Sequence, residues 1–78
     1  MSRTMSHRRE RLARLLKQLR IEAGLRQVDL AKKIGQPQSY VSRFESAEQR
    51  LDLIELETIC AALNTNIETL LIRLDGDE

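Results

Sequence analysis

The stretch QVDLAKKIGQPQSYVSRFE, residues 27–45, contains two short amphipathic segments on either side of a turn. The first segment ends at Gly35, which suits the backbone conformation found at the end of a helix. Pro37 lacks a backbone N–H, which costs nothing in the first turn of a helix, so we expect a second helix over residues 37–46. The inner face of this second helix consists of Val41 and Phe44. Two short helices joined by a three-residue turn have the spacing of a helix-turn-helix.

The segments before and after this stretch also show the apolar spacing of helices. Residues 8–23 combine one apolar stripe with a basic face, and Gly24 suits the end of that helix. Asp52 and Glu55 have the spacing of a capping box, which marks the start of a fourth helix. Asn64 suits the left-handed conformation that often follows a helix, so we expect the fourth helix to end there.

A fifth helix is predicted after Thr65 or Asn66, because either residue can cap its first turn. Its apolar residues are Ile67, Leu70, Leu71 and Leu74. The predicted fold is therefore an all-α, five-helix bundle over residues 8–74. A loose tail, residues 1–7, and a short acidic tail, residues 75–78, are expected at the two ends.

The composition agrees with one small all-α domain and disfavours several other classes of protein. With 78 residues, 41% of them hydrophobic and only 3% aromatic, the chain can form a single aliphatic core. Cys60 is the only cysteine, so we expect a small buried side chain rather than a disulfide or a metal site. His7 is the only histidine, and we therefore predict neither an enzyme nor a cofactor. No membrane-spanning segment is evident, so a cytoplasmic protein with no membrane partner is expected.

Charge is distributed unevenly along the chain. Residues 1–43 contain eleven Lys and Arg against three Asp and Glu, a net charge of +8. Residues 44–78 contain two Arg against nine acidic residues, a net charge of −7. Such a separation suits a molecule whose basic half meets a polyanion, although solvated helix faces would give the same totals.

The two stretches LRQVDLAKKIGQPQSYVSRFES and RLDLIELETICAALNTNIETLL resemble the phage lambda repressor and Cro type of helix-turn-helix domain, the Xre family of transcriptional regulators. The resemblance covers residues 8–74. Seven residues of different chemical types match the family's sequence pattern at once. They are Gln27, Ala31, Gly35, Ser39, Val41, Glu45 and Leu53. The resemblance implies a double-stranded DNA operator as partner, with the helix over residues 37–46 in the major groove.

The resemblance also implies which side chains read bases. The matching residues are Gln38, Ser39, Tyr40 and Arg43. Their chemistry suits this role, because Gln forms two hydrogen bonds with adenine, Arg does so with guanine, and Ser serves either. Two alternatives stay open at this point. Tyr40 could pack as an exposed aromatic on Pro37. Arg43 could form a surface ion pair with Glu22 or Glu48.

A second group of residues matches the family's phosphate contacts. Gln27 corresponds to the residue that holds a phosphate at a helix N-terminus. The remaining expected phosphate contacts are Arg26, Lys17, Ser46 and Arg50. Arg20 and Glu45 match a pair that forms an inward ion pair between the first and third helices, which gives that pair a structural role.

Two departures from the family's pattern weaken part of this assignment. Arg26 stands where many relatives have a capping Ser or Thr, so a cap is lost while a charge attracted to phosphate is added. After the third helix the chain reads Ser46-Ala47-Glu48, without the glycine that relatives often have. Glu48 would also repel a phosphate if it faced the DNA.

We therefore predict a sequence-specific DNA-binding transcriptional regulator, and more specifically a repressor. Operators of such proteins usually have two half-sites, so a homodimer is expected through the apolar side chains of the last helix. These are Ile67, Leu70, Leu71 and Leu74. The alternative is an antitoxin-type or other protein-binding module that binds a partner protein and regulates its own gene. Phage repressors and restriction-modification controllers of similar size are not distinguished by the sequence.

Overall fold

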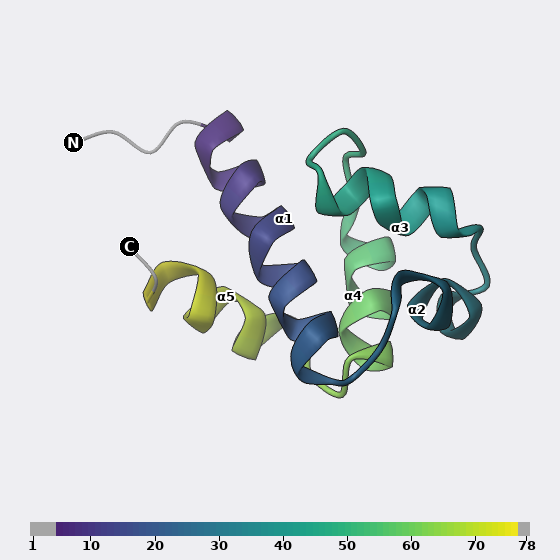
Figure 1. The fold of residues 1–78 in the computed structure, drawn as a ribbon. Helices are drawn as coiled ribbons and strands as arrows, with labels where there is room; N and C mark the ends of the chain where they lie inside the picture. Colours follow the sequence, from purple (N-terminus) through teal and green to yellow (C-terminus); the bar gives the residue numbers. More distant parts are fainter. Residues whose placement is uncertain (1–4, 77–78) are drawn as a thin grey trace.

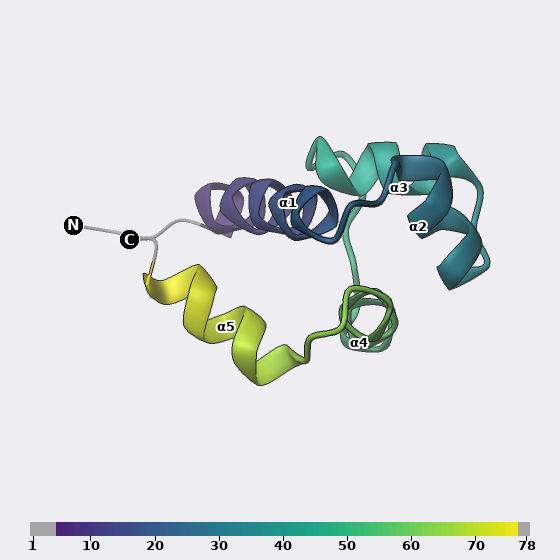
Figure 2. The same cartoon turned by 60° about the horizontal axis from the view of Figure 1, so that its bottom comes forward.

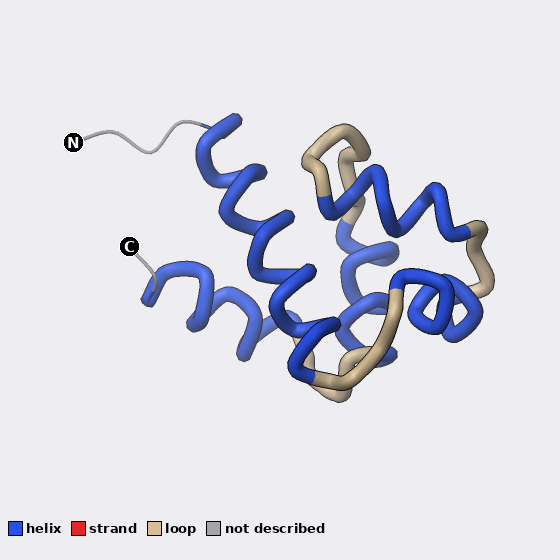
Figure 3. Tube along the Cα trace, in the orientation of Figure 1, coloured by secondary structure: helices blue, strands red, loops and turns tan. Residues whose placement is uncertain are grey.

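The computed structural model describes residues 5–76, and within that range it contains helices and no strand. The helices are α1 (Met5–Glu22), α2 (Gln27–Ile34), α3 (Gln38–Glu45), α4 (Leu53–Ala62) and α5 (Ile67–Gly76), as Figures 1 and 3 show. The predicted all-α, five-helix fold is thus confirmed. The turn between α2 and α3 is short, as a helix-turn-helix requires.

The helices are arranged in two layers (Figure 2). One layer contains α1, α2 and α3, and the other contains α4 and α5. Contacts between α1 and α5 and between α2 and α4 join the layers. The basic residues lie mainly in α1, α2 and α3, and α4 has acidic residues but no Lys or Arg. The first layer is therefore basic and the second acidic.

Several helix ends have the caps that the sequence predicts. The backbone N–H of Glu55 donates to Asp52 Oδ1 and the N–H of Asp52 donates to Glu55 Oε1, both at 2.8 Å, which completes the capping box of α4. Asn64 adopts a left-handed φ of 60° after α4. At the start of α5, Asn66 Oδ1 accepts the N–H of Thr69 at 2.8 Å, so Asn66 rather than Thr65 is the cap.

Side chains from all five helices, most of them aliphatic, form one core. Its buried members are Leu15, Leu16, Leu30, Ala31, Tyr40, Val41, Phe44, Ile59, Cys60, Leu63, Leu70 and Leu74. Ala31 is buried on α2, where only a small side chain lets α2 and α3 approach so closely. Burial also raises the pKa of the Cys60 thiol, so this cysteine behaves as a small apolar residue.

Both ends of the bundle extend further than expected. The predicted tail over residues 1–7 is wrong for residues 5–7, because α1 begins at Met5. The predicted tail over residues 75–78 is likewise wrong for residues 75–76, which belong to α5. An ion pair of 3.0 Å between Arg8 and Asp75 connects α1 and α5 beside these two extensions. Residues 1–4 and 77–78 lie outside the described residues.

Half of the expected dimer interface belongs to the core of the single chain. Leu70 and Leu74 are only 1% and 5% exposed, because their spacing of four residues places both on the side of α5 that faces α1. Ile67 is partly buried against the same core. Leu71 is exposed, as is its neighbour Ile72, which the sequence analysis did not single out.

The loop between α3 and α4 contains a residue in a strained conformation. Ala47 has a φ of 66°, in the left-handed region where a Cβ atom approaches the following carbonyl oxygen. The sequence analysis noted that this loop lacks the glycine that the family resemblance leads us to expect, and Ala47 takes the left-handed conformation in this chain.

We expect the substitution Ala47→Gly to raise the free energy of unfolding by about 1 kcal/mol, because glycine adopts a positive φ without steric cost. The change should appear as a rise in melting temperature of about 4 to 8 °C for a domain of this size. Ala61→Gly, on the exposed face of α4, is the matched control and should lower stability by a similar amount. Equal destabilisation by both substitutions would show that Ala47 is not strained.

Candidate nucleic-acid interface

The outer face of α3 consists of polar residues that protrude into solvent. Gln38, Ser39, Ser42 and Arg43 are exposed. On the opposite face of α3, Val41 and Phe44 are buried in the core. Since these two apolar residues are three positions apart, they fix the rotation of α3 and leave the polar positions outside. Ser42 is not among the base-reading residues that the sequence analysis predicted.

Tyr40 does not belong to this face, so its predicted role in base reading is wrong. The residue is 8% exposed and packs edge to face against Phe44, with ring centroids 5.7 Å apart. Its hydroxyl donates to Glu55 Oε2 at 2.8 Å. Burial, together with the nearby Glu55 carboxylate, raises the pKa of Tyr40 to about 12. The alternative of an exposed ring on Pro37 is wrong for the same reason, because Tyr40 faces α4 and joins the core.

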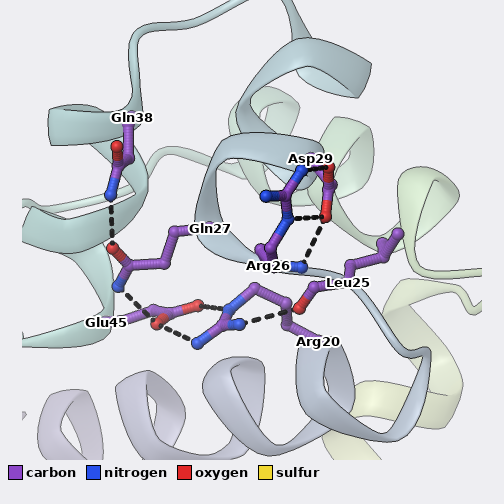
Figure 4. A network of polar contacts seen from close by, with 7 residues as sticks. All are labelled: Arg20, Leu25, Arg26, Gln27, Asp29, Gln38 and Glu45. Atoms are coloured by element: carbon purple, nitrogen blue, oxygen red, sulfur yellow. Dashed lines mark hydrogen bonds and ion pairs between the residues drawn. The ribbon is translucent and has the colours of Figure 1, made fainter.

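Arg20 and Glu45 form a buried ion pair between α1 and α3 (Figure 4). The side chains are 10% and 3% exposed. Arg20 Nε donates to Glu45 Oε2 at 2.6 Å and Nη2 donates to Oε1 at 3.0 Å, which is the two-pronged geometry that guanidinium and carboxylate favour. The third guanidinium nitrogen, Nη1, donates to the carbonyl oxygen of Leu25 at 2.8 Å. The pair thus joins α1, the α1–α2 loop and α3.

A chain of hydrogen bonds leads from this ion pair to the outer face of α3 (Figure 4). Gln27 Nε2 donates to Glu45 Oε1 at 3.0 Å. Gln38 Nε2 in turn donates to Gln27 Oε1 at 3.3 Å. The first residue of α2 and the first residue of α3 are therefore connected through their side-chain amides. Apart from a glutamine at the start of both helices, nothing in the sequence predicts this contact.

Arg26 precedes α2 and is tied to Asp29. Its Nε and Nη2 atoms each donate to the Asp29 carboxylate at 3.0 Å, and its backbone N–H donates at 2.8 Å. These bonds lower the pKa of Asp29 to about 2. Asp29 thereby supplies the half of a capping box that comes from the third helical residue, whereas a Ser or Thr at position 26 would supply the other half. The guanidinium of Arg26 still lies at the surface, because its side chain is 78% exposed.

The other expected phosphate contacts lie on different elements. Lys17 is exposed on α1. The hydroxyl of Ser46 is already engaged, since it donates to the carbonyl oxygen of Arg43 and lies 3.1 Å from a Glu48 carboxylate oxygen. Arg50 lines a depression of about 170 Å³ between α1 and the loop that follows α3.

Two further basic side chains of these helices are Arg9 on α1 and Arg43 on α3. Arg9, which the sequence analysis did not select, lines the same depression as Arg50 and also a second hollow that includes Leu74 of α5. Arg43 forms no ion pair with any residue in the described range 5–76, so the alternative pairing with Glu22 or Glu48 is wrong. Glu22 is bound instead by Arg73, at 3.3 Å.

Comparison with a helix-turn-helix family model finds a match over residues 16–70, which includes all of α2, α3 and α4. The chain belongs to the XRE family of helix-turn-helix proteins. Members of this family are DNA-binding transcriptional regulators, and the chain is one of them. The resemblance drawn from the sequence is thus confirmed. No curated protein sequence matches the chain significantly.

Solved structures agree with this membership. An XRE-family like protein from Pseudomonas syringae pv. tomato str. DC3000 shares 42% identity, with a TM-score of 0.81 over 88% of this chain and 84% of that one. The clp gene regulator ClgR from C. glutamicum shares 26% identity, with a TM-score of 0.82 over 88% of each chain. A mutant of the restriction-modification controller protein C.Esp1396I also shares 26% identity, with a TM-score of 0.83 over 88% of this chain and 92% of that one.

Among residues 5–76, no group of three or more His, Cys, Asp and Glu side chains is arranged to hold a metal ion. None of the helices in that range has the length and apolar character needed to cross a membrane.

Replacing Glu45 by Ala should lower the free energy of unfolding by roughly 3 to 5 kcal/mol, because it leaves the buried Arg20 guanidinium without its counter-charge. Urea unfolding followed by circular dichroism measures this loss. Glu48→Ala is the control, since Glu48 is exposed, and should change stability by no more than about 0.5 kcal/mol. A Glu45 variant that unfolds at the same urea concentration as the parent would contradict the structural role of the pair.

Proposed function

We propose that this chain is a sequence-specific repressor that binds double-stranded operator DNA as a homodimer and places α3 in the major groove. The observation that supports it is the exposed polar face of α3, with Gln38, Ser39 and Arg43, on the basic layer of the molecule. A helix presented in this way can enter the groove with its side chains directed at base edges. Repression would follow from occupying the operator in the cytoplasm and excluding polymerase.

The proposed base contacts follow from the chemistry of each side chain. Gln38 can accept from and donate to adenine, and Arg43 can donate twice to guanine. Ser39 can serve as donor or acceptor, and the exposed Ser42 lies beside Arg43 on the same face. Arg43 suits this role well because it spends no hydrogen bond on a carboxylate of the described chain.

The proposed phosphate contacts surround this face. The first N–H groups of α2, including that of Gln27, have no acceptor within the helix and can bind a phosphate oxygen. The remaining proposed contacts are Arg26, Lys17, Ser46 and Arg50. Arg26 can reach a phosphate only by leaving Asp29, and an exposed ion pair of this kind costs little to break.

Homodimer formation is supported by the exposed side of α5. Leu71 and Ile72 are 47% and 72% exposed there, a site where a second copy could cover apolar surface. The related controller protein C.Esp1396I has been crystallised as a tetramer on its natural 35 base-pair operator. In a two-fold dimer of this chain, the two α3 helices would lie roughly 34 Å apart, facing successive major grooves.

Two arginine substitutions separate base contacts from phosphate contacts. Arg43→Ala should weaken binding to the selected operator by roughly 1 to 3 kcal/mol and relax the preference at one or two base pairs, with far less effect on scrambled DNA. Arg26→Ala should weaken binding to both DNAs about equally and reduce the slope of log K against log salt by about 1. Fluorescence anisotropy on both DNAs at several salt concentrations measures these effects.

The operator for this experiment is obtained by incubating the protein with random DNA and sequencing what it retains. Equal weakening of both DNAs by Arg43→Ala, with altered base preference from Arg26→Ala, would mean that another face enters the groove. A parent protein that retains no DNA above nonspecific levels would contradict the repressor and favour the antitoxin-type, protein-binding alternative.

For the dimer, sedimentation of the parent should show a species of twice the 9.0 kDa chain mass, at high concentration or on DNA. Ile72→Glu should shift this equilibrium to the monomer, because it places a charge in the proposed apolar contact. Ile54→Glu is the matched control, since Ile54 is similarly exposed but lies on α4, and it should leave the equilibrium unchanged. A parent that stays monomeric with and without DNA would rule out the dimer.

A further inference from the structure

The depression of about 170 Å³ between α1 and the loop that follows α3 is bordered by two arginines. Arg9 comes from the N-terminal half of α1, and Arg50 comes from the loop. We infer that these two guanidinium groups together bind one phosphate group of the DNA backbone. The inference rests on the proposed function, which assigned a phosphate to Arg50 alone, and it adds a contact from a part of α1 that the proposed function does not use.

The lining of the depression is basic and polar at its rim and apolar beneath. Gln49 is the third polar residue beside Arg9 and Arg50. Among the lining residues that belong to the described range, none is Asp or Glu. Arg9 also borders the neighbouring hollow that includes Leu74, and no acidic residue of that range lines this hollow either. The apolar lining residues, which are buried or partly buried, are Leu12, Ala13, Leu16, Phe44, Ala47 and Leu51.

Neither guanidinium is neutralised by a carboxylate within residues 5–76. Arg9 and Arg50 form no ion pair there, whereas four other arginines do. The acids closest to Arg50 in the sequence are engaged elsewhere, since Glu48 accepts the hydroxyl of Ser46 and Asp52 caps α4. Two positive charges beside one small depression repel each other, and an anion between them replaces that repulsion by attraction. The four paired arginines are Arg8, Arg20, Arg26 and Arg73.

The loop that contains Arg50 is held in place by hydrogen bonds of its own. The backbone N–H groups of Glu48 and Gln49 both donate to the carbonyl oxygen of Arg43, at 2.9 and 3.2 Å. The side-chain amide of Gln49 donates to the carbonyl oxygen of Arg50 at 3.3 Å. Arg50 therefore starts from a defined backbone position, and a site whose groups are already positioned loses less conformational entropy on binding.

The size of the depression limits what can occupy it. Pockets for whole small-molecule ligands usually have about 300 to 1,000 Å³, so a depression of about 170 Å³ suits a single phosphate group that belongs to a larger molecule outside it. Arginine suits such a group because its planar guanidinium donates two parallel N–H bonds to two phosphate oxygens. Two arginines can thus bind one phosphate from two sides.

The place of the depression favours DNA as the source of that phosphate. Phe44, near the end of α3, borders the depression, whereas the proposed phosphate contact Gln27 lies beside Gln38, the first residue of α3. Both places belong to the basic layer that contains α1, α2 and α3 (Figure 2). A helix in the major groove has a sugar-phosphate backbone on each side. Contacts at both ends of α3 would therefore hold one strand each.

Arg9→Ala should weaken operator binding about tenfold, as expected for the loss of a hydrogen bond to a charged group. Arg14→Ala is the matched control, because Arg14 is exposed on the same helix but does not line the depression. It removes the same charge and should weaken binding by less than about twofold, through the long-range field alone. Fluorescence anisotropy at about 0.15 M salt measures both affinities. Equal effects of the two substitutions would overturn the inference.

An uncharged phosphate analogue tests whether Arg9 and Arg50 bind the same phosphate. Operators are made with one methylphosphonate at each backbone position in turn. At one position, this replacement should remove the effect of Arg9→Ala and also that of Arg50→Ala, because the group that both side chains bind is already gone. If the two effects disappear at different positions, or persist at every position, the arginines do not share a phosphate and the inference fails.

A titration with inorganic phosphate separates this inference from the proposed function. In ¹⁵N NMR spectra of the free protein, phosphate should shift the Nε–H signals of Arg9 and Arg50 with one dissociation constant and leave that of Arg14 in place. Such shifts support the site even if the protein binds no operator, and their absence would overturn it even if the operator is bound. Shifts in a protein whose operator affinity does not change in Arg9→Ala would mean that the depression takes free phosphate and not DNA, which also contradicts the inference. Melting curves establish that each variant is folded.

Discussion

The buried ion pair between Arg20 and Glu45 fixes the position of α3 relative to α1, and much of the interface depends on it. Two charges in the core are costly to desolvate, and here the cost is offset because all three nitrogens of the guanidinium and both oxygens of the carboxylate have partners. A hydrophobic contact in the same place would tolerate sliding. Paired hydrogen bonds tolerate much less, so α3 is held at one depth and one rotation.

A second polar contact holds α3 from the other layer. Glu55 caps α4 with one carboxylate oxygen and accepts the hydroxyl of Tyr40 with the other. The start of α4 and the first turn of α3 are therefore connected through a single side chain. One contact comes from α1 and the other from α4, so α3 is held on two sides. Its outer polar face remains exposed.

The helices and the family were predictable because apolar spacing, glycine and capping residues act locally, as at Gly35 and Asp52. Side-chain direction was harder to predict. Tyr40 adjoins residues that face outward, but its ring gains more from burial beside Phe44, and its hydroxyl finds an acceptor from a distant helix. The sequence analysis assigned Leu70 and Leu74 to a dimer interface, but both are buried in the single chain. The sequence of α5 alone does not show that these side chains pack against α1. The amide chain through Gln27 is equally nonlocal, since α2 and α3 must meet before it can form.

The opposite charges of the two layers affect how the molecule is oriented as it approaches a charged partner. A protein with a basic layer and an acidic layer has a large electric dipole, even though its net charge is only +1. In the field of a polyanion such a dipole is turned before contact, so that most encounters begin with the basic layer forward. At physiological ionic strength, salt screens the field over a distance of about 8 Å, so the molecule is turned only when it is already close to the polyanion. Added salt should therefore lower the association rate constant without altering any contact in the bound complex.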